Sequence, residues 1–188
     1  MGFRGVLPGG TKAAVRLALR KIIRAEARSR IVTDPAALRR IVAGLRARQR
    51  KVVFTNGVFD LLHVGHLSLL ERARALGDAL IVAINSDDSA RRLKGAGRPV
   101  ISQFARAQLL CGLRYVDACF IFTEDDPMNA IRTVRPDVLV KGSQYSVSRI
   151  VGARFVKSCG GKVARLPMVE GWSTTSTIRS LHDGAFFA

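Results

Sequence analysis

The sequence predicts an α/β fold, in which an open parallel sheet of about five strands carries helices on both faces and is preceded by a basic helical extension. Three observations predict it. From residue 51 onward, short apolar runs rich in β-branched residues alternate with helical patterns, which is typical of a parallel sheet covered by helices. Polar residues follow several of these runs directly. Before residue 51, arginines recur at every fourth position, with the period of a helix.

The predicted elements follow one another along the chain. Each strand is a short apolar run, and the runs lie near residues 51–55, 79–84, 118–122, 137–141 and 162–166. Each helix is a stretch with helical periodicity, near residues 65–76, 102–113, 127–134, 148–158 and 174–182. A length of 188 residues with 48% hydrophobic side chains favours a single core. We therefore expect one domain over residues 31–188 and an extension over residues 1–30.

The positive charge is spread unevenly along the chain. The formal net charge is +17, with 13 Lys and Arg against 2 acidic residues in residues 1–50, and 18 against 12 in residues 51–188. Most of the excess therefore belongs to the N-terminal part. The moderate excess that remains suits an enzyme with phosphorylated, anionic substrates, because a positive cleft raises their local concentration.

The N-terminal extension has the pattern of an amphipathic basic helix. An arginine stripe lies opposite an apolar side, and the two sets are Arg16, Arg20, Arg24 and Arg28 against Val15, Leu19 and Ile22. Such a helix could make peripheral contact with an anionic membrane, bind a partner, or be a dispensable solvated helix. No apolar run reaches the roughly 20 residues that span a bilayer, and no secretory signal is present, so we expect a cytoplasmic protein.

Polar residues follow three of the predicted strands. They are Thr55-Asn56-Gly57, Asn85-Ser86-Asp87 and Lys141-Gly142-Ser143. Ligands of open parallel sheets bind beyond the carboxyl ends of the strands, so these loops predict a ligand site. Turn or capping chemistry at a strand end would also explain the second group.

The segment 52–66 carries the most specific pattern in the chain. It runs from a buried strand through a glycine turn into the start of a helix, with His63 and His66 three residues apart. A helix N-terminus offers unpaired N–H groups and a positive dipole end, and Gly65 leaves room for a phosphate. The two imidazoles can add N–H donors. Histidines at this spacing can also be metal ligands or packed core residues, but the context of strand, turn and helix favours a phosphate site.

Two further groups have the chemistry to bind a triphosphate. Lys94 and Arg98 bracket a Gly-Ala-Gly turn, and such a cationic loop can close over phosphates, although a solvated basic loop has the same sequence. Ser173, Thr174 and Thr175 open the last helical pattern, where hydroxyl and free N–H groups suit a phosphate. Ser and Thr are also ordinary helix caps.

Several ordered motifs resemble a known family. The motif G-x-F-D-x-x-H-x-G-H resembles the signature of the cytidylyltransferase-like nucleotidyltransferases. The chain is also similar to the adenylyltransferase domain of ADP-heptose synthases over about residues 30–182, through F-T-N-G-x-F-D-L-L-H-x-G-H, I-V-A-I-N-S-D, R-R-L-K-G-x-x-R-P-V, R-P-D-V-L-V-K-G and E-G-x-S-T-T. Class I aminoacyl-tRNA synthetases carry a similar H-x-G-H, but nothing like their K-M-S-K-S signature occurs here.

The resemblance implies a Rossmann-like fold and an adenylyltransferase. It implies transfer of AMP from ATP to D-glycero-β-D-manno-heptose 1-phosphate, giving pyrophosphate and ADP-heptose, a precursor of lipopolysaccharide core. Mg²⁺ would bridge the ATP phosphates, a separate sugar kinase would supply the acceptor, and a homodimer is a further expectation. The expected catalytic residues are His63, His66, Lys94 and Arg98. The expected substrate contacts are Thr55, Asn56, Gly57, Phe59, Gly65, Asn85, Asp87, Lys141, Gly142, Ser173, Thr174 and Thr175, and no protein ligand of a metal is expected.

One departure from the family pattern concerns the acceptor. Where heptose enzymes usually read K-G-G-D-Y, this chain carries Gln144 in place of the Asp, and an amide only half reproduces a carboxylate that accepts hydrogen bonds from sugar hydroxyls. The alternatives are a related transferase acting on glycerol 3-phosphate, FMN or another phosphate ester with ATP or CTP, and a non-catalytic nucleic-acid-binding protein. Few aromatic residues interleave the N-terminal arginines, so we expect no nucleic-acid partner.

Overall fold

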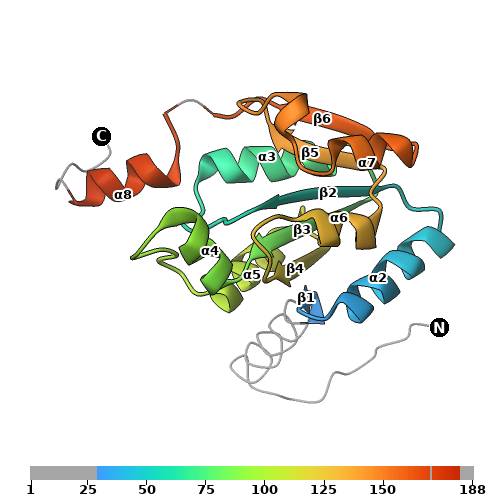
Figure 1. Cartoon of the computed structure of the whole chain (residues 1–188), viewed down its shortest axis with the longest axis horizontal. Helices are drawn as coiled ribbons and strands as arrows, with labels where there is room; N and C mark the ends of the chain where they lie inside the picture. Colours follow the sequence, from blue (N-terminus) through green and yellow to red (C-terminus); the bar gives the residue numbers. More distant parts are fainter. Residues whose placement is uncertain (1–28, 170, 183–188) are drawn as a thin grey trace, which may run out of the picture.

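The fold is a parallel sheet with helices on both faces (Figure 1). The computed structural model describes residues 29–169 and 171–182. Within these ranges the sheet has six strands, in the order β1-β4-β3-β2-β5-β6, and all neighbouring strands are parallel. Their bounds are β1 (Ile31–Val32), β2 (Val52–Gly57), β3 (Ala79–Asn85), β4 (Ala118–Phe122), β5 (Val138–Gly142) and β6 (Lys162–Leu166). The five predicted strands are confirmed, and β1 adds a sixth.

Two apolar layers hold the helices to the sheet. One layer joins the strands to α3 (Val64–Arg74) and α5 (Gln103–Gly112), and the other joins them to α2 (Pro35–Ala47), α6 (Met128–Val134) and α7 (Ala153–Ser158). Side chains of a strand alternate between its faces, so Leu80 and Val82 enter the first layer while Ile81 and Ala83 enter the second. The prediction of helices on both faces is therefore confirmed.

The region between residues 31 and 50, for which no element was predicted, belongs to the sheet and its helical cover. The Asp34 carboxylate accepts hydrogen bonds from the backbone N–H groups of Ala36 and Ala37, both at 3.0 Å, and caps α2. Proline at the first helical position is pre-set for a helix. The α2 side chains Leu38 and Val42 are buried in the second layer.

The helix predicted over residues 148–158 is wrong in its first half. A short 3₁₀ turn (Val147–Arg149) is followed by a break, and α7 begins only at Ala153. Gly152 in the break has a φ of 81°, a left-handed conformation that favours glycine, and a Cβ there would lie 2.7 Å from the Ile131 Cδ1. The break therefore depends on a contact with α6 that the local pattern does not contain.

The predicted extension lies almost wholly outside the described residues, including its arginine stripe from Arg16 to Arg28. Of residues 1–30 the structure describes Ser29 and Arg30. The Arg30 guanidinium donates hydrogen bonds to the carbonyls of Val116, at 2.9 Å, and Cys111, so the chain is tied to α5 and β4 just before β1. In the described ranges, no helix combines the length and apolar character needed to cross a membrane.

Candidate active site

A cleft of about 860 Å³ opens beyond the carboxyl ends of β2, β3 and β5. The chain passes from β2 to β3 and β4 on one side and returns to β5 and β6 on the other, so β2 lies at the switch point of the topology. Open parallel sheets bind ligands at this point. The predicted site residues that line the cleft are Thr55, Asn56, Gly57, Phe59, His63, His66, Asn85, Lys94, Arg98, Lys141, Gly142, Ser173, Thr174 and Thr175.

The two histidines lie against each other at the start of α3. Their ring centroids are 3.9 Å apart, His66 also contacts the Phe59 ring at 5.0 Å, and His63 stacks on Trp172 at 6.2 Å. The Nδ1 atoms of both histidines are buried and have no hydrogen-bond partner among the residues that the structure describes. Burial lowers the pKa of His63. Burial, and then repulsion from His63, lower the pKa of His66 to about 4 against a hydrogen bond with the Leu61 backbone. Both imidazoles are thus neutral near pH 7 and available to a ligand.

The structure does not bring Gly65 and Asp87 to the cleft walls. Gly65 is buried, and a Cβ there would approach the His63 ring to 3.0 Å, so this glycine makes room for an imidazole. The Asp87 carboxylate instead forms an ion pair of 2.8 Å with the guanidinium of Arg106, which is fully buried. The backbone N–H of Asp87 donates to the Gln103 side chain at 2.8 Å. Asp87 therefore braces the start of α4 (Asp87–Lys94).

The floor of the cleft is formed by neighbouring residues of β2 and β5. The Thr55 hydroxyl is buried and donates to the Val140 carbonyl at 3.1 Å, and the Lys141 ammonium donates to the Asn56 carbonyl at 3.0 Å. The Asn56 side-chain oxygen is buried and has no hydrogen-bond partner in the described part of the chain. Burial lowers the pKa of Lys141 to about 8. The floor therefore holds a titratable cation and an unused acceptor side by side.

The loop after β5 carries the residue that departs from the family pattern. A Cβ at Gly142 would lie 2.1 Å from the Gln144 Oε1, so the Gln144 amide folds back over the glycine. The Tyr145 ring lies 5.9 Å from the Lys141 Nζ. Lys141, Gly142, Gln144 and Tyr145 all line the cleft, and the Gln144 amide lies against Gly142, the residue after Lys141.

A second wall of the cleft is formed by the end of α4, the turn that follows it and the start of α8. Lys94 ends α4, and the following turn has positive φ at Gly95 (91°) and Gly97 (77°). Arg98 comes next, and its Nε donates to the Asp60 carboxylate at 2.6 Å. The Ser173 hydroxyl accepts the backbone N–H of Ser176 at 3.0 Å at the start of α8 (Thr174–His182). Ser173, which was predicted as a phosphate ligand, therefore also caps α8.

Sequence reasoning missed two charged residues beneath this wall. Asp60 and Arg106 are 1% and 0% exposed, and neither was singled out. The signal for Arg106 is its position on the face of α5 that Ala107 and Leu110 bring into the core. Buried charged groups are rare unless they are paired, so an arginine on an apolar helix face indicates a nearby partner.

The fold and this cleft define a class of protein, the nucleotide-binding α/β enzymes that act on phosphates. The family model described as cytidylyltransferase-like matches residues 54–176. The chain belongs to this family, which confirms the predicted class of enzyme, a nucleotidyltransferase.

Curated relatives narrow the comparison. The chain is 51% identical over 156 residues to the bifunctional protein HldE of Koribacter versatilis. The matched region covers 83% of this chain and 32% of the relative. It is 48% identical over 180 residues to HldE of Pseudomonas fluorescens, covering 94% of this chain and 38% of the relative. The chain thus spans about a third of the length of these relatives.

Two solved structures resemble the fold. The lipopolysaccharide core biosynthesis protein of Thermoplasma volcanium has a TM-score of 0.55 and 28% identity, covering 64% of this chain and 99% of that one. The pantoate-beta-alanine ligase of Francisella tularensis has a TM-score of 0.59 and 17% identity, and the match covers 79% of this chain and 72% of the ligase. The second likeness shows the fold alone.

Proposed function

We propose that the chain transfers the AMP part of ATP to a sugar 1-phosphate and releases pyrophosphate. The acceptor proposed is D-glycero-β-D-manno-heptose 1-phosphate, and the product is ADP-heptose. The observation that carries the proposal is the pair of neutral imidazoles, in ring contact with each other, whose buried Nδ1 atoms lack partners among the described residues, in a cleft also lined by Lys94 and Arg98. The motifs shared with ADP-heptose synthases, and identities near one half to the HldE proteins, support adenylyl transfer in particular.

The proposed reaction needs positioning more than covalent chemistry. A phosphate oxygen of the acceptor attacks the α-phosphorus of ATP in line, and pyrophosphate leaves. His63 and His66 donate N–H groups to the transferring phosphoryl group, while Lys94 and Arg98 bind the outer phosphates. Donors fixed in advance, where charge develops, lower the barrier without reorganisation during the reaction.

The nucleotide occupies the centre of the cleft in this proposal. Thr55, Asn56, Gly57, Phe59 and Asn85 surround its nucleoside part, and Ser173, Thr174 and Thr175 bind phosphates from α8. ATP would be bound together with Mg²⁺, which would offset part of the negative charge of its phosphates. Among the described residues, no three His, Cys, Asp or Glu side chains gather as a metal site.

The acceptor lies over Lys141 and Gln144 in this proposal. The Lys141 ammonium binds the acceptor phosphate, and the Gln144 amide contacts a sugar hydroxyl. An amide in place of the usual carboxylate favours, as a second candidate, another phosphate ester such as glycerol 3-phosphate or FMN, with ATP or CTP as donor. A sugar 1-phosphate acceptor also requires a kinase that makes it, and we place both reactions in the cytoplasm, where ATP is available. A homodimer stays a prediction.

A pyrophosphate-release screen tests the function. ATP and CTP are each paired with heptose 1-phosphate, other sugar 1-phosphates, glycerol 3-phosphate and FMN, and the product is identified by mass. The proposal expects release with ATP and heptose 1-phosphate, and the highest kcat/KM for that pair. Turnover restricted to another ester moves the function to the second candidate. A folded chain with no turnover on any pair removes the transferase assignment.

A further inference from the structure

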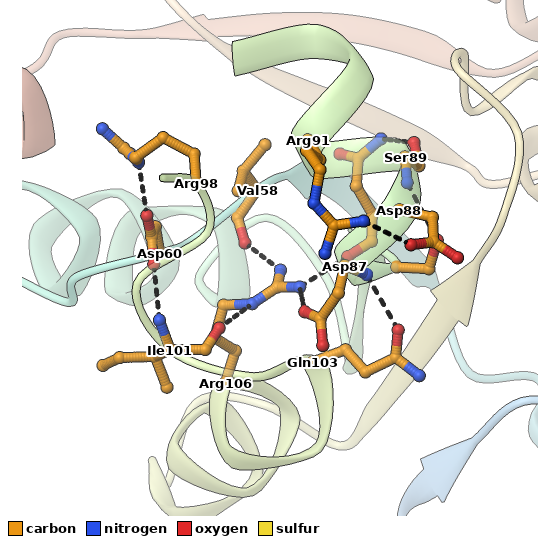
Figure 2. Close-up of polar contacts among 12 residues, drawn as sticks. Val58, Asp60, Asp87, Asp88, Ser89, Arg91, Arg98, Ile101, Gln103 and Arg106 are labelled. Atoms are coloured by element: carbon orange, nitrogen blue, oxygen red, sulfur yellow. Dashed lines mark hydrogen bonds and ion pairs between the residues drawn. The ribbon is translucent and has the colours of Figure 1, made fainter. Parts of the chain in front are cut away.

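A buried carboxylate lies under the cationic wall of the cleft. Asp60 is 1% exposed and accepts three hydrogen bonds, from the Arg98 Nε at 2.6 Å and from the backbone N–H groups of Val100 and Ile101 at 2.8 and 3.0 Å. Figure 2 shows the Asp60 carboxylate between Arg98 and Ile101, with a dashed line to each. Among the described residues, the hydrogen-bond donors to the Asp60 carboxylate all belong to the segment 98–101, so this carboxylate joins the loop after β2 to the loop before α5.

A buried guanidinium fixes the same loop from the other side. Arg106 is fully buried and donates to the carbonyls of Ile101 at 2.8 Å, Val58 at 2.6 Å and Asn85 at 2.9 Å, in addition to its ion pair with Asp87. A planar guanidinium can hold several acceptors in a fixed geometry. The Ile101 peptide is therefore held at its N–H by Asp60 and at its carbonyl by Arg106 (Figure 2).

The bracing stops where the glycine turn begins. The structure gives Gly95 and Gly97 positive φ values and no atom within 4 Å of a Cβ built at either position. Lys94, on the far side of this turn, is exposed, whereas the Arg98 side chain is only 18% exposed. The two cations of the cleft wall thus differ: Lys94 is exposed at the end of α4, and Arg98 is anchored through its Nε.

The anchoring leaves part of Arg98 for a ligand. Its Nε bonds to Asp60, and its two terminal nitrogens form no hydrogen bond within the described residues. Arg98 lines the cleft. A guanidinium held by a charge-assisted bond at Nε keeps a two-nitrogen face that matches two phosphate oxygens.

We propose that Asp60 is a positioning residue, which orients the Arg98 guanidinium toward the outer phosphates of the nucleotide on a loop braced by Arg106. The inference rests on the proposed use of a nucleoside triphosphate. Asp60 itself bonds only to the protein, so it acts through Arg98. The consequence is a contribution to the binding of ATP that AMP, which lacks the outer phosphates, does not share.

Nucleotide binding measured by calorimetry, without any acceptor, tests this role. Asp60→Asn keeps the size of the side chain but replaces one carboxylate oxygen with an amide NH₂ group. This group is a donor, so it cannot accept a hydrogen bond from the Arg98 Nε–H or from the backbone N–H that it faces. We expect the Kd of MgATP to rise about tenfold, the loss of one charge-assisted hydrogen bond, and the Kd of AMP to stay within about twofold. Asp88→Asn is the matched control, because it removes an exposed carboxylate paired with Arg91 at 2.7 Å outside the cleft.

A double-mutant cycle separates positioning from a merely structural role. If Asp60 acts through Arg98, Asp60→Asn weakens MgATP no further in an Arg98→Ala background. An additive loss, or an equal loss for AMP, overturns the proposal even if the enzyme turns over heptose 1-phosphate normally. A wild-type chain that binds MgATP no more tightly than AMP also overturns it.

A second variant keeps the test valid if Asp60→Asn does not fold. Arg98→Lys retains the charge and leaves the buried carboxylate its two backbone donors, but a single ammonium cannot bind Asp60 and two phosphate oxygens in the same geometry. We expect several-fold weaker MgATP binding and unchanged AMP binding. Wild-type affinity of this variant for MgATP would refute the role of the anchored guanidinium.

Discussion

The two walls of the cleft are built in different ways. The inner wall, which we define as His63, His66 and Lys141, lies on α3 and β5, and its groups are partly or largely buried with lowered pKa values. The outer wall, which we define as Lys94 and Ser173–Thr175, lies at helix ends and is largely exposed. Buried donors are fixed before a substrate arrives, whereas exposed ones are screened by water and salt. We infer that the inner wall serves the chemical step and the outer wall serves nucleotide capture.

Replacement of His66 is expected to have the largest effect. His66→Ala should lower kcat by about 10²-fold or more, because it removes a fixed donor to the transition state. Steady-state kinetics with ATP and the acceptor measure this, and thermal melting checks the fold, since the ring also contacts Phe59. Leu67→Ala, the next residue of α3 and 41% exposed, is the control. Near-wild-type turnover in a folded His66→Ala enzyme would exclude this histidine from the mechanism.

Lys141 gives the inner wall a pH dependence. Its pKa of about 8 means that the cation is present below pH 8 and is lost as the pH rises through that value. The kcat/KM for the acceptor, which reports the free enzyme, should therefore fall on the alkaline side with a midpoint near 8.

Lys141→Met provides the comparison for this profile. It should lower kcat/KM for the acceptor about tenfold, leave the KM for ATP nearly unchanged, and abolish the alkaline limb of the profile. An unchanged limb in Lys141→Met would assign the titration to another group. An equal loss for both substrates would place the Lys141 ammonium at the nucleotide instead.

Lys94 tests the outer wall. Because this side chain is exposed and ends α4, Lys94→Ala should raise the KM for ATP by only a few-fold, with less change in kcat. The difference from wild type should shrink as salt is added, since exposed charges are screened. Arg91→Ala, on the same helix but outside the cleft, is the control. A large, salt-independent fall in kcat would show that Lys94 becomes enclosed during the reaction and would break the distinction between the walls.

The same division separates what the sequence could predict from what it could not. The five longer strands and the residues that follow them were predictable, because short apolar runs and glycine turns are local patterns in the sequence. Asp60 and Arg106 were not, because their backbone partners lie up to 41 and 48 residues away along the chain. The strand β1 has only two residues, and its pairing with Cys119 and Phe120 of β4 leaves no periodicity to read. Local patterns thus located residues that line the cleft, and long-range contacts determine how these residues are held.

Replacement of Gln144, which lines the cleft, should give the smallest effect. Its amide folds over Gly142 beside Lys141, yet the residue is exposed. If it contacts a sugar hydroxyl, Gln144→Asp should raise kcat/KM for heptose 1-phosphate by a few-fold, since a carboxylate accepts more strongly than an amide, and should leave ATP binding unchanged. For an ester that places no hydroxyl donor at this position, the new carboxylate should give no such gain. Ser148→Asp is the control, because Ser148 is exposed and lies outside the cleft. Gln103→Asp is unsuitable, because the Gln103 side chain accepts a hydrogen bond from the Asp87 backbone N–H. Measurements of kcat/KM for the Gln144→Asp enzyme with heptose 1-phosphate and with FMN therefore tell which ester the inner wall fits. A change in the KM for ATP as large as the change for the acceptor would place Gln144 away from the acceptor.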